Sequence, residues 1–185
     1  MNDPFVILGI AGSLRKESFN RLLLQAAGEL VPEGARLETF ELDGLPLFNQ
    51  DEEDKPHPRV TELKERVRAA DAILFVTPEY NYSIPGVLKN AIDCASRPYG
   101  DSAWNGKPVA IMGASIGTLG TARAQYHLRQ TFVFLNMHAV NQPEVMVSNA
   151  SKRFDPEGKL TDETTKKLIQ QLLAELVNWT KRLQE

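Results

Sequence analysis

The fold is decided by residues 5–20, which read FVILGIAGSLRKESFN. The first six are apolar and rich in branched side chains, which is typical of a strand buried inside a parallel sheet. From Phe19 onward, apolar residues recur with the spacing of one helix face. Ser18 is a suitable N-cap for that helix. The stretch therefore predicts a strand, a short polar loop and the start of a helix.

The loop between this strand and this helix is a candidate anion site. Unpaired N–H groups and the positive end of the helix dipole stabilise a phosphate at such a place, and Arg15 adds a charge-assisted hydrogen bond. Ser13, Ser18 and Asn20 add hydroxyl and amide groups. The alternative is a capped helix with an exposed arginine, because such caps often serve the helix alone.

The loop lacks the two common nucleotide-binding signatures. It contains no Gly-x-x-x-x-Gly-Lys-Ser/Thr run, and Gly9 and Gly12 do not complete Gly-x-Gly-x-x-Gly. Both a P-loop nucleotidase and a Rossmann dinucleotide site are therefore disfavoured. Three small polar side chains and one guanidinium suit a compact terminal monophosphate better.

Apolar runs alternate with helix-period segments along the chain, which is the pattern of a parallel sheet covered on both faces. Five strands are expected, at 5–10, 36–40, 72–76, 108–112 and near 139–140, with 144–147 close behind the last. Helices are expected at 19–30 and 59–69, from 84, from 121, and in a terminal segment ending near 182. We predict one domain over residues 1–185, an α/β, flavodoxin-like doubly wound fold with a five-stranded parallel sheet of order 2-1-3-4-5 and helices on both faces.

In such a sheet, ligands bind outside the carboxyl ends of the strands, so function is expected in the loops after strands one, three and four. The second of these loops, residues 77–86, has prolines at 78 and 85, which stiffen it and leave its backbone amides pointing outward. Ser83 is expected to cap the helix that follows. The third loop, residues 113–121, holds three glycines that let the backbone approach a ligand; a flexible turn is the alternative.

Composition excludes several classes of protein. The net charge of −3 gives no reason to expect nucleic acid as a partner. The N-terminus has no basic region and its apolar run is too short for a signal peptide or a membrane span, so a cytoplasmic protein with no membrane partner is expected. The single Cys94 excludes an internal disulfide and a cysteine-based metal cluster, and we interpret it as a packing residue. The acidic stretch 49–58 is interpreted as a solvated surface loop.

Three motifs together resemble a known family. They are Gly-Ser-Leu-Arg-x-x-Ser-x-Asn from Gly12, Pro-Glu-Tyr-Asn-x-Ser-x-Pro-Gly-x-Leu-Lys-Asn-Ala-Ile-Asp from Pro78, and Gly-Ala-Ser-x-Gly-x-x-Gly from Gly113. In this order and spacing they are similar to the NADPH-dependent FMN reductase family of flavodoxin-like quinone, chromate and azo-dye reductases. The resemblance covers nearly the whole chain, including the connection 45–49, which resembles the family's acidic loop.

This resemblance implies FMN as cofactor, with NADPH or NADH as cosubstrate. It implies that the first loop holds the FMN phosphate, that the second borders the isoalloxazine largely through backbone groups, and that the third approaches the flavin from the other side. The residues expected to bind the cofactor are Ser13, Arg15, Ser18, Phe19, Asn20, Pro78, Glu79, Tyr80, Asn81, Ser115 and Gly117. The sequence does not distinguish NADH from NADPH.

The implied reaction is a ping-pong scheme, in which hydride passes from nicotinamide to flavin N5 and two electrons then leave to a quinone-like, azo, chromate or flavin acceptor. The resemblance also implies a homodimer or homotetramer. Because the cofactor carries the hydride, we expect no catalytic side chain and no metal. Glu79 is expected to cap nearby backbone rather than relay a proton. His57, His127 and His138 lie outside the three loops and are expected in packing or surface roles.

Two other functions remain open at this point. A flavodoxin-type carrier would share the fold and the FMN but pass single electrons to a protein partner, and such carriers usually have a stronger acidic balance. A low-molecular-weight phosphatase would share the phosphate loop after strand one. That mechanism needs a nucleophilic cysteine in the loop, whereas Cys94 lies far away in a helix.

Overall fold

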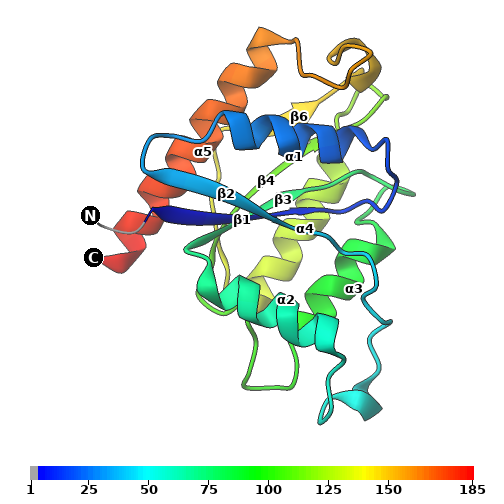
Figure 1. Ribbon diagram of the computed structural model, residues 1–185, viewed down its shortest axis with the longest axis vertical. Coiled ribbons are helices and arrows are strands. Elements are labelled where there is room, and N and C mark those ends of the chain that lie inside the picture. The colour runs from blue at the N-terminus through cyan, green and yellow to red at the C-terminus, as the bar shows by residue number, and fades with distance from the viewer. Residues whose placement is uncertain (1–3) are drawn as a thin grey trace.

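The computed structural model describes residues 4–185, which build a parallel sheet between two layers of helices (Figure 1). The strands are β1 (Phe5–Ala11), β2 (Ala35–Phe40), β3 (Ala72–Val76), β4 (Pro108–Ala114), β5 (His138–Ala139) and β6 (Val145–Val147). The α-helices are α1 (Phe19–Glu29), α2 (Pro58–Ala69), α3 (Gly86–Ala95), α4 (Ala122–Leu135) and α5 (Glu163–Gln184), with short 3-10 turns at Gln50–Glu52 and Ala150–Lys152. The strand order β2-β1-β3-β4-β5 confirms the predicted fold class.

The fifth strand differs from the expectation, because it consists of two short pieces along the same edge of β4. β5 pairs with the start of β4, at Pro108 and Val109, and β6 pairs with its end, at Met112–Ala114. Between the two pieces lies Pro143, which has no N–H to donate to a ladder. The sheet therefore has six strands by hydrogen bonding but five positions across its width.

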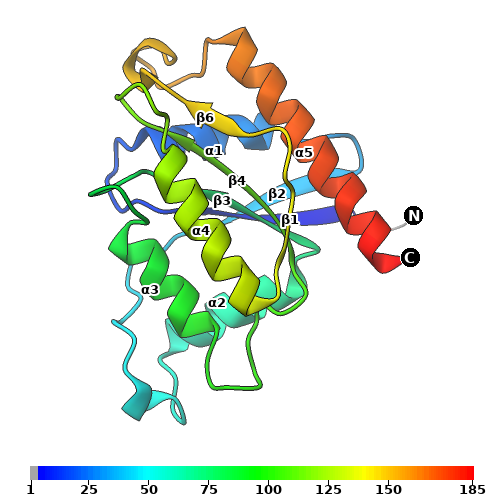
Figure 2. The same ribbon diagram turned by 180° about the vertical axis from the view of Figure 1, so that it is seen from behind.

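Helices cover both faces of the sheet. α1 and α5 lie on one face and α2, α3 and α4 on the other, as the two opposite views show (Figures 1 and 2). Each face has its own buried cluster, and β3 contributes alternate residues to both, with Leu74 in one and Phe75 in the other. All residues of β3 and β4 are buried, which explains why they read as continuous apolar runs. From residue 4 onward, no helix has the length and apolar character needed to span a bilayer.

One helix start was predicted wrongly. Ser83 does not cap α3, which begins at Gly86 with Pro85 in the N-cap position. The backbone of Ser83 instead pairs with Tyr80, with hydrogen bonds from Tyr80 N to Ser83 O of 3.1 Å and from Ser83 N to Tyr80 O of 3.0 Å. This turn keeps Ser83 outside the helix, and the carbonyl of Pro85 accepts the first hydrogen bonds of α3.

Candidate functional site

The loops after β1, β3 and β4 meet at one edge of the sheet, at the right of Figure 1. Hydrogen bonds continue the ladder past the strand ends: Gly12 N donates to Val76 O and Thr77 N donates to Met112 O, each at 2.9 Å. Ser115 N donates in the same way to Val147 O, also at 2.9 Å. The three loops that carry the sequence motifs are thus fixed side by side at the switch point between β1 and β3.

Two glycines allow this close approach. A Cβ at Gly12 would lie 3.3 Å from Pro78 Cδ and 3.1 Å from Leu88 Cδ2. A Cβ at Gly113 would lie only 2.3 Å from Thr77 O, a distance that real Cβ atoms do not reach. Any side chain at Gly113 would therefore push the second and third loops apart.

The first loop has two buried serines with exposed residues between them. Ser13 and Ser18 are buried, whereas the side chain of Arg15 is 66% exposed and has only a long contact of 3.8 Å with Glu17. Ser13 Oγ accepts a hydrogen bond from Arg15 N, at 3.3 Å, which fixes the bend of the loop. Ser18 is the N-cap of α1, as predicted, and its Oγ accepts from Asn20 N.

Backbone donors remain free at the start of α1. Within residues 4–185, no acceptor pairs with the N–H of Lys16, Glu17 or Ser18. Free N–H groups at a helix N-terminus, with a guanidinium beside them, are suited to an anion. The residues present therefore fit the phosphate of FMN.

Asn20 and Phe19 have side chains engaged in the fold. Asn20 is 3% exposed; its Nδ2 donates to Ala114 O at 2.9 Å and its Oδ1 accepts from Ala114 N at 2.8 Å. The amide thus joins α1 to the end of β4. The ring of Phe19 packs against that of Phe154, with centroids 5.6 Å apart. Both side chains anchor the loop to the rest of the fold, Asn20 at the end of β4 and Phe19 on Phe154, and neither is open at the surface of the loop.

The second loop is tied to the start of α4. Glu79 Oε2 accepts hydrogen bonds from Arg123 N at 3.0 Å and Ala124 N at 3.2 Å, and Glu79 Oε1 forms an ion pair with the Arg123 guanidinium. The prediction that Glu79 caps backbone is confirmed. Desolvation disfavours the charge of Arg123, but the hydrogen bond and charge of Glu79 outweigh it, so the pKa of the guanidinium lies above its usual value.

Beyond Glu79 the second loop opens to solvent. Pro78 is buried beneath it, whereas Tyr80 and Asn81 are exposed. Within the part of the chain that the structure describes, the N–H groups of Asn81 and Tyr82 have no hydrogen-bond acceptor. The loop thus presents an aromatic ring, an amide and free backbone donors at the same edge as the first loop.

The third loop is braced by the segment after β6, which the sequence analysis did not single out. Gly117 O accepts from Asn149 N at 3.1 Å and Ser115 O accepts from Ala150 N at 3.0 Å. Ser115 Oγ accepts from Gly117 N at 3.1 Å, so the two expected residues hold each other. Gly117 is exposed and Ser115 is half-buried. The loop is therefore a shaped turn rather than a flexible connection.

Arg123 and His127 are two further residues that the sequence analysis did not place at the site. Both lie on α4, four residues apart, and both contact the second loop: Arg123 through Glu79 and Tyr82, and His127 through Ser83. No motif marked them, because a helix following a glycine-rich loop carries no sign of which face turns toward another loop.

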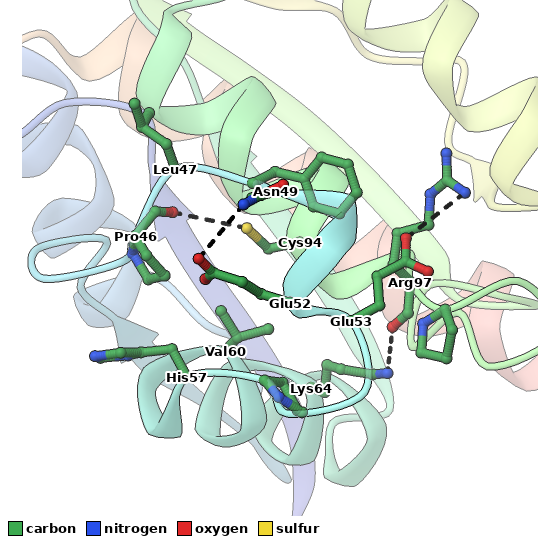
Figure 3. Close-up of a pocket in the computed structure, with 13 residues that line it drawn as sticks. Pro46, Leu47, Asn49, Glu52, Glu53, His57, Val60, Lys64, Cys94 and Arg97 are labelled. Carbon is green, nitrogen blue, oxygen red and sulfur yellow. Dashed lines mark hydrogen bonds and ion pairs between the residues drawn. The ribbon is translucent and has the colours of Figure 1, made fainter.

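A separate hollow lies under the connection 46–53, between α2 and α3 (Figure 3). The thiol of Cys94 and the carboxylate of Glu52 point into it, and Glu53 pairs with Arg97 at one end, 3.9 Å away. Burial raises the pKa of the Cys94 thiol and the charge of Asp93 raises it further, which is unsuited to a nucleophile. The described lining includes none of the residues expected at the cofactor.

Comparisons with known proteins identify the family of this chain. The model of the NADPH-dependent FMN reductase family matches residues 6–152. An NAD(P)H-dependent FMN reductase of Pseudomonas aeruginosa is 54% identical, with 99% of each chain covered. A quinone reductase of Pseudomonas putida is 43% identical, with 98% of this chain and 97% of the relative covered.

Among solved structures, the flavoenzyme NAD(P)H:(acceptor) oxidoreductase FerB of Paracoccus denitrificans superposes with a TM-score of 0.87 at 37% identity. The superposition covers 96% of this chain and 98% of that one. The match of the family model and the identities of 54% and 43% show that this chain belongs to the NADPH-dependent FMN reductase family and is an oxidoreductase.

Proposed function

We propose that this protein is an FMN-dependent NAD(P)H oxidoreductase that reduces small molecules, with quinones as the favoured acceptors. The observation that carries the proposal is the convergence of three motif loops at the switch point of the sheet, around free N–H groups at the start of α1. The names of the relatives, an FMN reductase and a quinone reductase, support the class of acceptor.

At the phosphate end we assign direct contacts to Ser13, Arg15 and Ser18, together with the free N–H groups of the loop. Arg15 is exposed and weakly paired, so its guanidinium is free to form a bidentate hydrogen bond with a phosphate. Asn20 holds the loop against Ala114 and keeps the donors in place. Phe19 contributes through its backbone, because its ring packs on Phe154.

At the ring end we assign Tyr80, Asn81 and the backbone beyond Pro78 to one side of the isoalloxazine, and the turn Ser115–Gly117 to the other. Bound FMN would supply the redox chemistry, a two-electron exchange first with the nicotinamide and then with the acceptor. The protein's task is to hold and orient the ring. Glu79 is committed to Arg123 and to the start of α4, which supports a structural role.

The proposal extends to the assembly and the range of acceptors. Exposed apolar side chains on α4, namely Tyr126, Val133 and Phe134, support a homodimer or homotetramer. An exposed reduced flavin would also serve azo dyes, chromate and free flavin, so we include these acceptors. A cytoplasmic location stays a prediction.

The test is the visible spectrum of the purified protein under anaerobic conditions, before and after NADPH or NADH is added. We expect a flavin band, from copurified or added FMN, that bleaches with a nicotinamide and returns when a quinone is added. The rates would rank the two nicotinamides. A flavin band that neither nicotinamide bleaches would favour the single-electron carrier, and failure to bind FMN would overturn the assignment of the loops.

A further inference from the structure

The turn at the end of the second loop has a costly backbone. Asn81 and Tyr82 both lie in the left-handed region, with φ of 50° and 66°. Asparagine tolerates this region, but a bulky residue such as tyrosine rarely adopts it. The two hydrogen bonds between Tyr80 and Ser83 close the turn around these residues. Such a conformation persists only where neighbouring groups hold it in place.

α4 supplies the neighbours at the beginning and middle of the turn. Glu79 accepts from the first N–H groups of the helix, and the Arg123 guanidinium lies over the Tyr82 ring, 3.5 Å from its centroid. Tyr82 is nevertheless 67% exposed, so packing alone holds it weakly. A further interaction is needed to hold the end of the turn, at Ser83.

His127 provides that interaction through a hydrogen bond to Ser83. Its Nδ1 lies 2.9 Å from Ser83 Oγ, and it stands one helical turn after Arg123. The N–H and C=O of Ser83 are both used within the turn, and its hydroxyl does not cap α3, so within residues 4–185 the bond to His127 is the one hydrogen bond of that side chain. A hydroxyl both donates and accepts, so the bond forms with either tautomer of the imidazole.

We propose that His127 is a positioning residue for the flavin. Through Ser83 it holds the Tyr80–Ser83 turn in the conformation that presents the free N–H groups of Asn81 and Tyr82 to the isoalloxazine. The proposal rests on the proposed function, since it takes this turn as a border of the isoalloxazine. It assigns a role to a histidine for which the sequence indicated only a packing or surface role.

The test compares five variants of the full-length protein, four at the hydrogen bond and one control. His127→Leu removes the hydrogen bond and keeps the bulk, Ser83→Ala removes it from the other side, and the double variant tests whether the two effects share one interaction. His127→Asn offers an amide in place of Nδ1 and is the rescue. Gln130→Ala, an exposed position on the same helix, is the matched control.

Two quantities are measured: the exchange of the Tyr80 and Ser83 amides without FMN, and the Kd for FMN by calorimetry. We expect faster exchange and about threefold to tenfold weaker binding in His127→Leu and in Ser83→Ala, the range for one neutral hydrogen bond. The double variant should be no worse than either single one, His127→Asn should bind like the wild type, and Gln130→Ala should change nothing.

The outcomes separate this proposal from the proposed function. If the wild type fails to bind FMN, the proposed function falls, while the exchange measurement still shows whether His127 holds the turn. If exchange is unchanged in His127→Leu, the turn does not depend on His127 and the inference is wrong. If exchange rises but FMN affinity stays the same, or if the two single effects add in the double variant, His127 is not a positioning residue for the flavin.

Discussion

Arg15 and Asn20 stand five residues apart in the same motif and have opposite surroundings. The Arg15 side chain is open to solvent, whereas the Asn20 amide is buried with both of its polar atoms bonded to Ala114. An open guanidinium gains a partner when a phosphate arrives, whereas the buried amide already uses one N–H and one lone pair on Ala114, which fix it against the end of β4. At the scale of the residue, our proposal therefore makes Arg15 an exposed ligand of the phosphate and Asn20 a buried support beneath the loop.

Arg15→Ala tests whether Arg15 is a ligand of the phosphate. We expect the affinity for FMN to fall by about 1.5–3 kcal/mol, roughly tenfold to 150-fold, because a hydrogen bond to a charged group is lost. Calorimetric titration of the apoprotein with FMN measures the change. Lys16→Ala is the matched control, since it removes the same formal charge from the neighbouring exposed position and should cost much less. Equal losses in the two variants would mean that general charge, and not a contact of Arg15, attracts the phosphate.

At the scale of the element, the pattern of apolar residues predicted those strands and helices whose bounds depend on local burial. The expected bounds of β3 agree with the structure, because every residue of Ala72–Val76 is buried and apolar. α1 was found through its apolar face and Ser18, which caps it as expected. The role of Ser83 was predicted wrongly, because its backbone closes a turn with Tyr80 and its hydroxyl bonds the distant His127. Both pieces of the fifth strand were expected, but not that they pair separately with the start and the end of β4. No local pattern reports a contact between residues 44 positions apart.

The long helix α5 gives a prediction at this scale. Its N-cap, Asp162, accepts hydrogen bonds from Thr165 N at 2.9 Å and Thr165 Oγ1 at 2.6 Å, and pairs with Arg153. The hydrogen bonds from Thr165, and then the Arg153 partner, lower the pKa of this carboxyl. We expect Asp162→Ala to reduce the free energy of unfolding at neutral pH by about 1 kcal/mol, the usual loss for a helix N-cap.

The pH dependence of this loss follows from the sign of the shift. A carboxyl whose pKa is lowered in the folded state stabilises it above the unfolded pKa of about 3.9, and this contribution is lost as pH falls through the folded value. Urea unfolding should therefore show a constant difference between wild type and Asp162→Ala above roughly pH 5 that shrinks below about pH 4. Glu157→Ala, at an exposed carboxylate before the helix, is the control. A difference that persists unchanged into acid would mean that the carboxylate charge contributes nothing.

At the scale of the whole molecule, the candidate site is assembled from segments that lie far apart in the sequence. Its loops follow β1, β3 and β4, and the third is braced by Asn149 and Ala150 after β6. Parallel strand order brings these parts together, which is why the motifs could be assigned to one edge before the structure was known. The contribution of Asn149 and Ala150 after β6 could not be predicted, because their contacts are backbone hydrogen bonds that do not depend on the side chain.

A site assembled from loops across the sheet should couple FMN binding to the stability of the whole chain. A ligand that binds only the folded state, at about 100 times its Kd, adds about 2.7 kcal/mol. For a domain of this size, that corresponds to a rise in Tm of roughly 5–11 °C. We expect differential scanning calorimetry to show one transition, moved upward by FMN as a unit, as the predicted single domain requires.

Riboflavin and Arg15→Ala serve as matched controls for this shift. Riboflavin has the ring without the phosphate, so at the same concentration it should raise Tm less than FMN does. Arg15→Ala should lose about half to nine-tenths of the FMN-induced rise and leave the riboflavin-induced rise unchanged, because its contact is with the phosphate alone. Two separate transitions would contradict a single domain. Equal shifts with FMN and riboflavin would show that the loop before α1 does not hold a phosphate, even if the ring still binds between the second and third loops.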